Sequence, residues 1–220
     1  MISWFTKKKI ATGNQDFDRY LHQTFKVPKD LEIEDLNFVV LDCEMTGLDK
    51  DAELVSLGAV NVANNRILTS DALDFKFSFS KNNSAAAIHG ELSGIEGEVP
   101  ATAIAEILDF IKNSVIVGHS IAIDMEQLNG ILRSANSQLK LKNQVLDTFD
   151  LMKRLDPTRF ERSVAGQNSL RLDALCQELN VPIENRHTAL GDAFMTAQVL
   201  LKLLNRLKKR KVLTAGQLFR

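Results

Sequence analysis

The chain has 220 residues, of which 45% are hydrophobic and 25% are charged. This length and this composition are typical of one globular domain with a sizeable core and short terminal segments. The formal net charge is −1, so the overall charge favours neither nucleic acid nor a membrane surface as a partner. Any binding of nucleic acid has to come from local patches of charge.

Cysteine usage and hydropathy indicate a cytoplasmic protein. The two cysteines, Cys43 and Cys176, are far apart in sequence, which predicts neither a disulfide framework nor a zinc site and fits a reducing compartment. No apolar run approaches the roughly 20 residues that span a bilayer. The first residues lack the apolar stretch of a signal peptide, so no membrane partner is expected.

Residues 1–35 are expected to form an N-terminal extension. Apolar residues from Phe17 to Phe25 have helical spacing, which predicts a short amphipathic helix that ends near Pro28. This helix either packs on the main domain or serves as a docking arm for a partner.

An α/β domain is predicted over residues 36–207. Its first strand is an uninterrupted apolar run at 38–41, which is typical of a buried central strand. The expected elements are strands at 38–41, 54–62 and 67–79, a helix after residue 100, a strand at 115–117, a helix at about 122–134, a strand at 145–149, and helices near 169–179 and 191–207. Three strands followed by alternating helices and strands predict a mixed central sheet flanked by helices.

Residues 208–220 are expected to be a basic C-terminal tail. The run Lys208-Lys209-Arg210-Lys211 suits the negative end of a helix dipole. The run is interpreted as a solvated helix end, and a contact with nucleic-acid phosphates is the alternative.

Two acidic residues stand at the end of the first predicted strand. Side chains alternate along a strand, so Asp42 and Glu44 project to the same side. Adjacent carboxylates repel each other unless a cation lies between them, and Mg²⁺ and Mn²⁺ prefer oxygen ligands. A solvated strand end before a turn is the alternative explanation of the pair.

Further acids and histidines lie at the ends of later elements. Asp124 begins a helix, where the dipole favours an acid, and His119 before it is interpreted as a local hydrogen-bonding residue. Asp192 heads an apolar stripe of the last long helix, so it faces the domain and needs a metal or another partner. His187 lies in the preceding loop and is a candidate base, since histidine titrates near neutral pH. Asp147, at another strand end, is interpreted as a supporting hydrogen-bond residue rather than a ligand.

Three segments, DCEMTGL at 42–48, HSIAID at 119–124 and HTALGDA at 187–193, resemble the motifs of the DEDDh 3′–5′ exonucleases. The nearest resemblance is to the epsilon proofreading subunit of bacterial DNA polymerase III. It implies a ribonuclease H-like fold and hydrolysis of the terminal phosphodiester bonds of nucleic acid, DNA being favoured, to nucleoside 5′-monophosphates. Ser120 and Ile123 depart from the usual second motif, which puts the substrate preference in doubt but not the activity.

The resemblance also implies roles for individual residues. Two divalent cations, Mg²⁺ or Mn²⁺, would be held by four carboxylates, those of Asp42, Glu44, Asp124 and Asp192. In the two-metal mechanism of the family, His187 would take the proton of the attacking water.

A second group of residues matches segments that contact substrate in the family. Thr46, Gly47 and Leu48 match the segment that contacts the terminal sugar and base. His89, in Ile88-His89-Gly90, matches a segment of the substrate pocket, with a structural histidine as the alternative. His119 is the remaining candidate for substrate binding.

Two other functions remain open beside a DNA exonuclease. One is an RNA exonuclease of the ribonuclease T or oligoribonuclease type, which the 2′-hydroxyl of the substrate would distinguish. The other is a proofreading module that acts mainly by binding a polymerase. The expected partners are therefore nucleic-acid 3′ ends, single-stranded DNA above all, and a DNA polymerase or another replication or repair protein.

Overall fold

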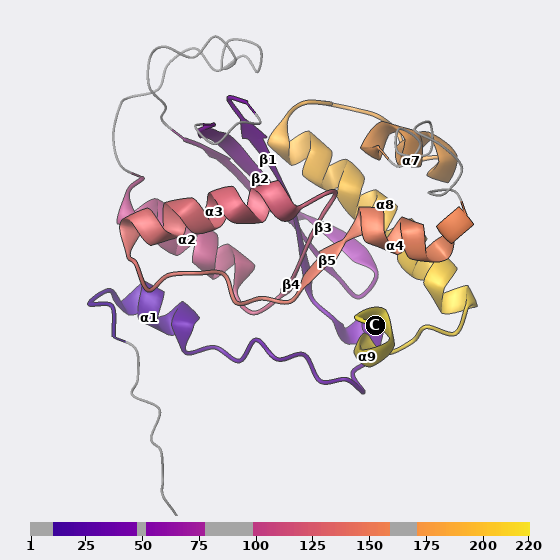
Figure 1. Ribbon diagram of the computed structural model, residues 1–220, viewed down its shortest axis with the longest axis horizontal. Helices are drawn as coiled ribbons and strands as arrows, with labels where there is room; N and C mark the ends of the chain where they lie inside the picture. The colour runs from indigo at the N-terminus through magenta and orange to yellow at the C-terminus, as the bar shows by residue number, and fades with distance from the viewer. Residues whose placement is uncertain (1–10, 48–51, 78–98, 159–170) are drawn as a thin grey trace, which may run out of the picture.

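The computed structural model of the chain describes residues 11–47, 52–77, 99–158 and 171–220. Its centre is a five-stranded mixed sheet flanked by helices (Figure 1), as the sequence predicts. The strands are β1 (Phe38–Met45), β2 (Leu54–Ala63), β3 (Arg66–Lys76), β4 (Val115–Gly118) and β5 (Val145–Asp147). They lie in the order β3-β2-β1-β4-β5, with β1, β2 and β3 antiparallel to one another in turn and β1, β4 and β5 parallel.

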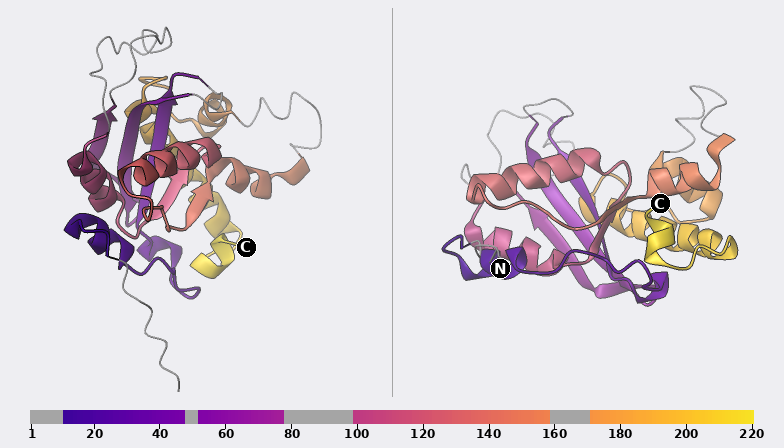
Figure 2. Two further views of the ribbon diagram at one scale, coloured as in Figure 1. Left: turned by 60° about the vertical axis from the view of Figure 1, so that its left-hand side comes forward. Right: turned by 60° about the horizontal axis from the view of Figure 1, so that its bottom comes forward.

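Helices pack on both faces of this sheet (Figure 2). They are α1 (Gln15–Leu21), the 3₁₀ helix η1 (Ile33–Asp35), α2 (Ala101–Ile111), α3 (Ala122–Ala135), α4 (Thr148–Leu155), α7 (Leu172–Leu179), α8 (Ala189–Lys209) and α9 (Ala215–Leu218). None of these described helices is long and apolar enough to cross a membrane.

β1 contributes alternately to two hydrophobic cores. Val39, Leu41 and Cys43 are buried against α1, α2 and α3, whereas Phe38 and Val40 are buried against α4, α7 and α8. Because strand side chains alternate, the two acids that end β1 continue the second set. They therefore face the side of the sheet that α8 covers.

The position of α8 over the sheet depends on a glycine in β2. A Cβ atom on Gly58 would lie 2.1 Å from the backbone nitrogen of Leu190 in the first turn of α8. Any side chain at this position would push the helix away from the strand. The backbone contact thus holds the start of α8 close to β1, which pairs with β2.

The segment at 145–149 differs from the sequence-based expectation, the N-terminal helix ends at Leu21 rather than near Pro28, and a short helix, α9, lies in the predicted C-terminal tail. The strand predicted over 145–149 ends at Asp147, and Phe149 lies in α4, a helix that the sequence does not predict. The physical reason is helix capping, because the Asp147 carboxylate accepts a hydrogen bond from the backbone N–H of Phe149 at 2.8 Å. The strand predicted over 67–79 ends at Lys76, and Phe79 lies outside the described residues.

The N-terminal helix packs on the main body of the protein. Phe17, Tyr20 and Leu21 of α1 are buried in one of the two cores. The Tyr20 hydroxyl donates a hydrogen bond to Oδ1 of Asn143 at 2.6 Å and accepts one from the backbone N–H of Lys142 at 3.0 Å. The geometry therefore agrees with the packing interpretation of this helix.

The C-terminal segment returns to the N-terminal one. The backbone N–H of Ile33 donates to the carbonyl of Leu213, and that of Ala215 donates to the carbonyl of Leu31, each at 2.8 Å. Lys208 forms an ion pair with Glu34 in the same region. α9 consequently lies beside the chain that leads into β1 (Figure 1).

Candidate active site

Three carboxylates meet on the face of β1 that α8 covers. Asp42 and Glu44 come from the end of β1, and Asp192 comes from the first turn of α8. One oxygen of each lies within 4.8 Å of those of the other two. Three of the four acids that the sequence singles out are thus brought together from segments about 150 residues apart.

The electrostatics of this cluster are those of a cation site. Burial raises the pKa of Asp42 well above its ordinary value, and the charges of Asp124, Asp192 and Glu44 raise it further. Burial also raises the pKa of Asp192 to about 6, against the opposing charge of Arg186. Both shifts mean that negative charge is costly here unless a cation accompanies it.

Asp192 also has an unused ligand atom. The residue as a whole is only 3% exposed, and its Oδ1 atom is buried without a hydrogen-bond partner among the described residues. A buried carboxylate oxygen without a donor is costly unless a cation coordinates it. The donor set, which consists of carboxylate oxygens alone, suits a hard divalent cation.

Asp124 approaches the cluster from behind β1. Its Oδ1 accepts a hydrogen bond from the backbone N–H of Cys43 at 3.0 Å. Burial raises the pKa of Asp124 to about 6, and its charge in turn raises the pKa of Asp42. Asp124 is therefore a neighbour of the three-acid cluster but is not one of its members.

The connection between β4 and α3 is held by a carboxylate from β5. Asp147 accepts hydrogen bonds from the backbone N–H groups of Ser120 at 2.9 Å and Ile121 at 3.0 Å, besides capping α4. Ser120 has a φ of 58°, a backbone conformation that non-glycine residues rarely adopt. Asp147 therefore has the supporting role expected of it, because it fixes the loop that leads to Asp124.

His119 is engaged in a local hydrogen bond in the same loop. Its Nδ1 lies 2.9 Å from Oγ1 of Thr148, and that hydroxyl donates to the carbonyl of Gly118 at 3.0 Å. Thr148 therefore links His119 to the end of β4. His119 also lines a cavity of about 350 Å³ together with Asp42 and Asp192.

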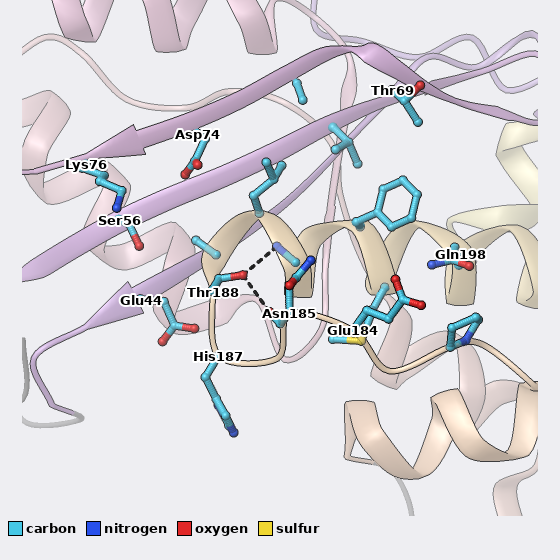
Figure 3. A pocket seen from close by; sticks show the side chains of 18 residues that line it. Glu44, Ser56, Thr69, Asp74, Lys76, Glu184, Asn185, His187, Thr188 and Gln198 are labelled. Atoms are coloured by element: carbon cyan, nitrogen blue, oxygen red, sulfur yellow. Dashed lines mark hydrogen bonds between the residues drawn. The ribbon is translucent and has the colours of Figure 1, made fainter. Parts of the chain in front are cut away.

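His187 lies in the loop between α7 and α8, beside the cluster. Its φ is 63°, and it precedes Thr188, whose hydroxyl accepts from the backbone N–H of Gly191 at 3.2 Å and so caps α8. The positive charge that His187 can carry lowers the pKa of Asp192. In Figure 3 its imidazole points away from the strands, and His187 and Glu44 line the same cavity.

A second cavity, of about 610 Å³, opens on the other side of this loop. Its floor contains a row of side chains that crosses the sheet, because Glu44 pairs with Ser56 and Ser56 pairs with Lys76 in the strand register (Figure 3). Phe194 of α8, 37% exposed, lines the cavity as well. The cavity therefore begins at the acid cluster and extends to the edge strand β3.

Sequence reasoning missed one residue of this site, Arg186. Its guanidinium pairs with Asp192 through Nη1 and with Asp173 of α7 through Nε. Asp173 is 13 residues from Arg186 in sequence. This separation matches no helical or strand spacing that would predict the pair. The only signal in the sequence is the position of this arginine, which directly precedes the segment HTALGDA at 187–193.

The other predicted substrate-binding residues are only partly within the described chain. The Thr46 hydroxyl accepts from the backbone N–H of Glu53 at 2.9 Å, and the Thr46 N–H donates to the Glu53 carbonyl at 3.0 Å. Thr46 thus links the end of β1 to the residue before β2, and Gly47 follows it. Leu48 and His89 lie outside the described residues, and the substrate contacts of all four remain predictions.

Comparison with known proteins places the chain among nucleases. Residues 39–200 match the model of the exonuclease family designated RNase_T. The chain is 33% identical over 196 residues to a DNA polymerase III subunit epsilon-like protein of Rhodobacter capsulatus, a match that covers 84% of this chain and 26% of that protein. It is 29% identical over 187 residues to a PolC-type DNA polymerase III of Thermotoga petrophila, covering 82% of this chain and 13% of the relative.

A third relative is named for the activity itself. A 3′-5′ exonuclease DinG of Staphylococcus epidermidis is 29% identical over 190 residues, and the match covers 83% of this chain and 20% of that protein. The chain therefore spans about a quarter or less of the length of these curated relatives.

Solved structures with a similar fold include exonuclease I. The exonuclease I of E. coli in complex with a dT13 oligonucleotide has a TM-score of 0.61 and 18% identity, covering 80% of this chain and 43% of that one. An exonuclease I from Methylocaldum szegediense has a TM-score of 0.59 and 19% identity, covering 79% and 41%. These similarities confirm the predicted ribonuclease H-like fold.

Proposed function

The chain belongs to the exonuclease family whose model spans its residues 39–200, and on that premise we propose that it is a metal-dependent 3′–5′ exonuclease acting on DNA ends. The observation that carries this proposal is the meeting of Asp42, Glu44 and Asp192, with one oxygen of each within 4.8 Å of the others. A partly buried site that gathers acids instead of separating them is suited to cations.

The proposed ligands of two divalent cations, Mg²⁺ or Mn²⁺, are the carboxylates of Asp42, Glu44, Asp124 and Asp192. The fit is supported by the unpartnered, buried Oδ1 of Asp192 and by the raised pKa of Asp42. Oδ1 of Asp124 is engaged by the backbone of Cys43, so we expect Asp124 to contribute its other oxygen. Bound cations supply two effects, a lower pKa for a water molecule and neutralisation of charge on the phosphodiester.

His187 is the proposed general base. It precedes the helix that carries Asp192, it borders the cavity that Glu44 lines, and an imidazole accepts protons near neutral pH. In the proposed reaction His187 takes a proton from water, and the water oxygen forms a bond to the terminal phosphorus. The bond from phosphorus to O3′ of the preceding nucleotide breaks and O3′ takes a proton from solvent water, so a nucleoside 5′-monophosphate leaves and the shortened strand ends in a 3′-hydroxyl.

DNA is the proposed substrate, with single-stranded 3′ ends favoured. This choice is supported by the relatives, two of which are named for DNA polymerase III, and by the solved complex of exonuclease I with a dT13 oligonucleotide. A DNA polymerase or another replication protein is the corresponding proposed partner.

The proposal is tested by product analysis on matched DNA and RNA oligonucleotides of one sequence, with Mg²⁺ and with Mn²⁺. Purified protein is expected to release nucleoside 5′-monophosphates successively from the 3′ end of DNA, and faster than from RNA. Products that arise from internal cleavage or from the 5′ end would contradict the polarity. Faster release from RNA would reassign the substrate.

The role of His187 is tested by replacing it with alanine. We expect the turnover rate on DNA to fall by roughly 10²- to 10⁴-fold, the usual contribution of a general base. Asp150→Asn, which changes an exposed acid on α4, is the control and should leave the rate unchanged. A His187→Ala protein with the wild-type rate would show that His187 is not the general base.

A further inference from the structure

Arg186 holds its guanidinium between carboxylates from two different helices. Nη1 pairs with Oδ2 of Asp192 in the first turn of α8, and Nε pairs with Oδ1 of Asp173 in the first turn of α7. The planar fork of a guanidinium is suited to two acceptors at once. The Arg186 side chain is 24% exposed, whereas that of Asp192 is 5% exposed, so the pair with Asp192 is largely removed from water.

Arg186 is also a charge partner of a second acid in the cluster, Asp42. When Asp42, Glu44 and Asp192 are ionised they carry three negative charges within 4.8 Å. The positive charge of Arg186 lowers the pKa of both Asp42 and Asp192, and their charges raise the pKa of Arg186 in return. In the metal-free protein, Arg186 therefore offsets part of the charge that divalent cations would otherwise neutralise.

A metal ion and Arg186 compete for the same carboxylate. Oδ1 of Asp192 is without a partner among the described residues, but Oδ2 is paired with Arg186. A divalent cation on Asp192 would stand next to the guanidinium, and two cations a few ångströms apart repel each other strongly where little water screens them. Asp173 supplies a second anchor, through which Arg186 can remain attached when its bond to Asp192 is lost.

We propose that Arg186 is a displaceable counter-cation of the metal site. It pairs with Asp192 in the metal-free protein, and it leaves Asp192 while staying on Asp173 when a divalent cation binds. This inference rests on the proposed function, because it requires Asp192 to be a metal ligand. Its consequence is that the acids bind metal less tightly than they would without Arg186.

The first test measures Mn²⁺ binding by calorimetry, at constant pH and without nucleic acid. We expect Arg186→Gln to lower the Kd for Mn²⁺ by roughly ten-fold, a change similar in size to the usual coupling between two binding events on one protein. The matched control is Arg171→Gln. Arg171 lines the same 350 Å³ cavity but makes no ion pair with Asp192 in the described part of the chain, so its loss reports only the general effect of removing a positive charge.

The outcomes of this test are distinct. The proposal would be overturned if Arg186→Gln bound Mn²⁺ with a Kd equal to or higher than that of Arg171→Gln. Arg186 would then support metal binding or have no effect on it. Absence of Mn²⁺ binding by the wild-type protein would overturn the metal-dependent function and this inference with it.

A second measurement uses the wild-type protein and therefore does not depend on the folding of a variant. Phenylglyoxal modifies accessible arginines, and peptide mass mapping reports the rate at each one. Mn²⁺ should increase the rate of modification at Arg186, because its bond to Asp192 is released, whereas Arg171 serves as the internal reference. A rate at Arg186 that Mn²⁺ leaves unchanged or lowers would contradict the displacement.

Discussion

The carboxylate of Asp124 accepts a hydrogen bond from the backbone N–H of Cys43 at 3.0 Å. Cys43 stands between the two acids of β1, so this bond attaches α3 to the part of the strand that carries Asp42 and Glu44. Both groups are buried, and the bond is therefore shielded from water. Asp124 thus combines an observed structural contact with its proposed function as a metal ligand.

These two roles of Asp124 can be separated by two substitutions. Asp124→Asn keeps an oxygen that accepts from the Cys43 N–H. It also removes a buried negative charge, whose cost is seen in the pKa of Asp124, raised by burial to about 6. We therefore expect this variant to be at least as stable as the wild-type protein at pH 7. Asp124→Ala leaves a buried N–H without an acceptor and should lower the free energy of unfolding by about 1–3 kcal/mol. Urea denaturation measures both.

Nuclease activity should disappear in both Asp124 variants, since neither retains the charged ligand. An Asp124→Asn protein that degrades DNA at the wild-type rate would show that Asp124 is structural only.

Asp147 should stabilise the loop between β4 and α3. Its carboxylate accepts backbone N–H groups from Ser120, Ile121 and Phe149. Asp147→Ala removes all three hydrogen bonds and is expected to lower the free energy of unfolding by about 1–3 kcal/mol. Asp150→Ala, at an exposed position close by, is the control in the same urea titration. Equal urea midpoints for Asp147→Ala and Asp150→Ala would show that the hydrogen bonds of Asp147 do not stabilise the loop.

Stability of the metal-free protein should fall as the pH rises through the range from about 4 to 6. Burial raises the pKa of Asp124 and Asp192 to about 6, and it raises that of Asp42 as well. Between the ordinary value of 3.8 and these raised values, the folded protein binds more protons than the unfolded chain, so the free energy of unfolding decreases with pH. Thermal denaturation in EDTA over this range measures the effect.

Two comparisons test the origin of this pH dependence. A variant with Asp42→Asn and Asp192→Asn should show a smaller loss of Tm, because two of the titrating groups are gone. Mn²⁺ should raise the wild-type Tm at pH 7.5 more than at pH 5, since metal ligands must be deprotonated. The interpretation is wrong if the double variant reproduces the wild-type profile.

Gly58 should be intolerant of a side chain. Its Cβ would lie 2.1 Å from the backbone nitrogen of Leu190, so Gly58→Ala must displace the start of α8 and with it Asp192. We expect a loss of about 1–3 kcal/mol in the free energy of unfolding, as in other overpacked cores, and reduced Mn²⁺ affinity. Gly130→Ala in α3 is the matched control, because a Cβ at Gly130 would meet nothing within 4 Å among the described residues; it should gain about 0.5–1 kcal/mol. Similar stabilities for the two variants would refute the close contact.

Patterns within single elements made part of the site predictable from sequence. Alternation along β1 put Asp42 and Glu44 on one side, and the apolar stripe of α8 turned Asp192 toward the domain; the structure brings these three together. Most of the strands and helices followed from the same periodicities, whereas η1, α4 and α9 were not predicted.

Features that depend on contacts between distant segments could not be predicted in this way. The pairing of Arg186 with Asp173, and the contact of Gly58 with α8, arise only once the helices are packed. The short helix α4 was missed because its first two residues were assigned to the predicted strand at 145–149. Its start depends on Asp147, which the sequence presents as one strand-end acid among several.

The most direct test of the central claim is the digestion of 5′-labelled single-stranded DNA with Mn²⁺ by the wild-type protein and by Asp192→Asn. The wild-type protein should shorten the strand from its 3′ end in single-nucleotide steps and should stop when EDTA is added. Asp192→Asn, with an isosteric side chain, should fold and leave the DNA intact. Digestion by Asp192→Asn at the wild-type rate, or DNA left intact by the wild-type protein, would contradict an exonuclease centred on the three carboxylates.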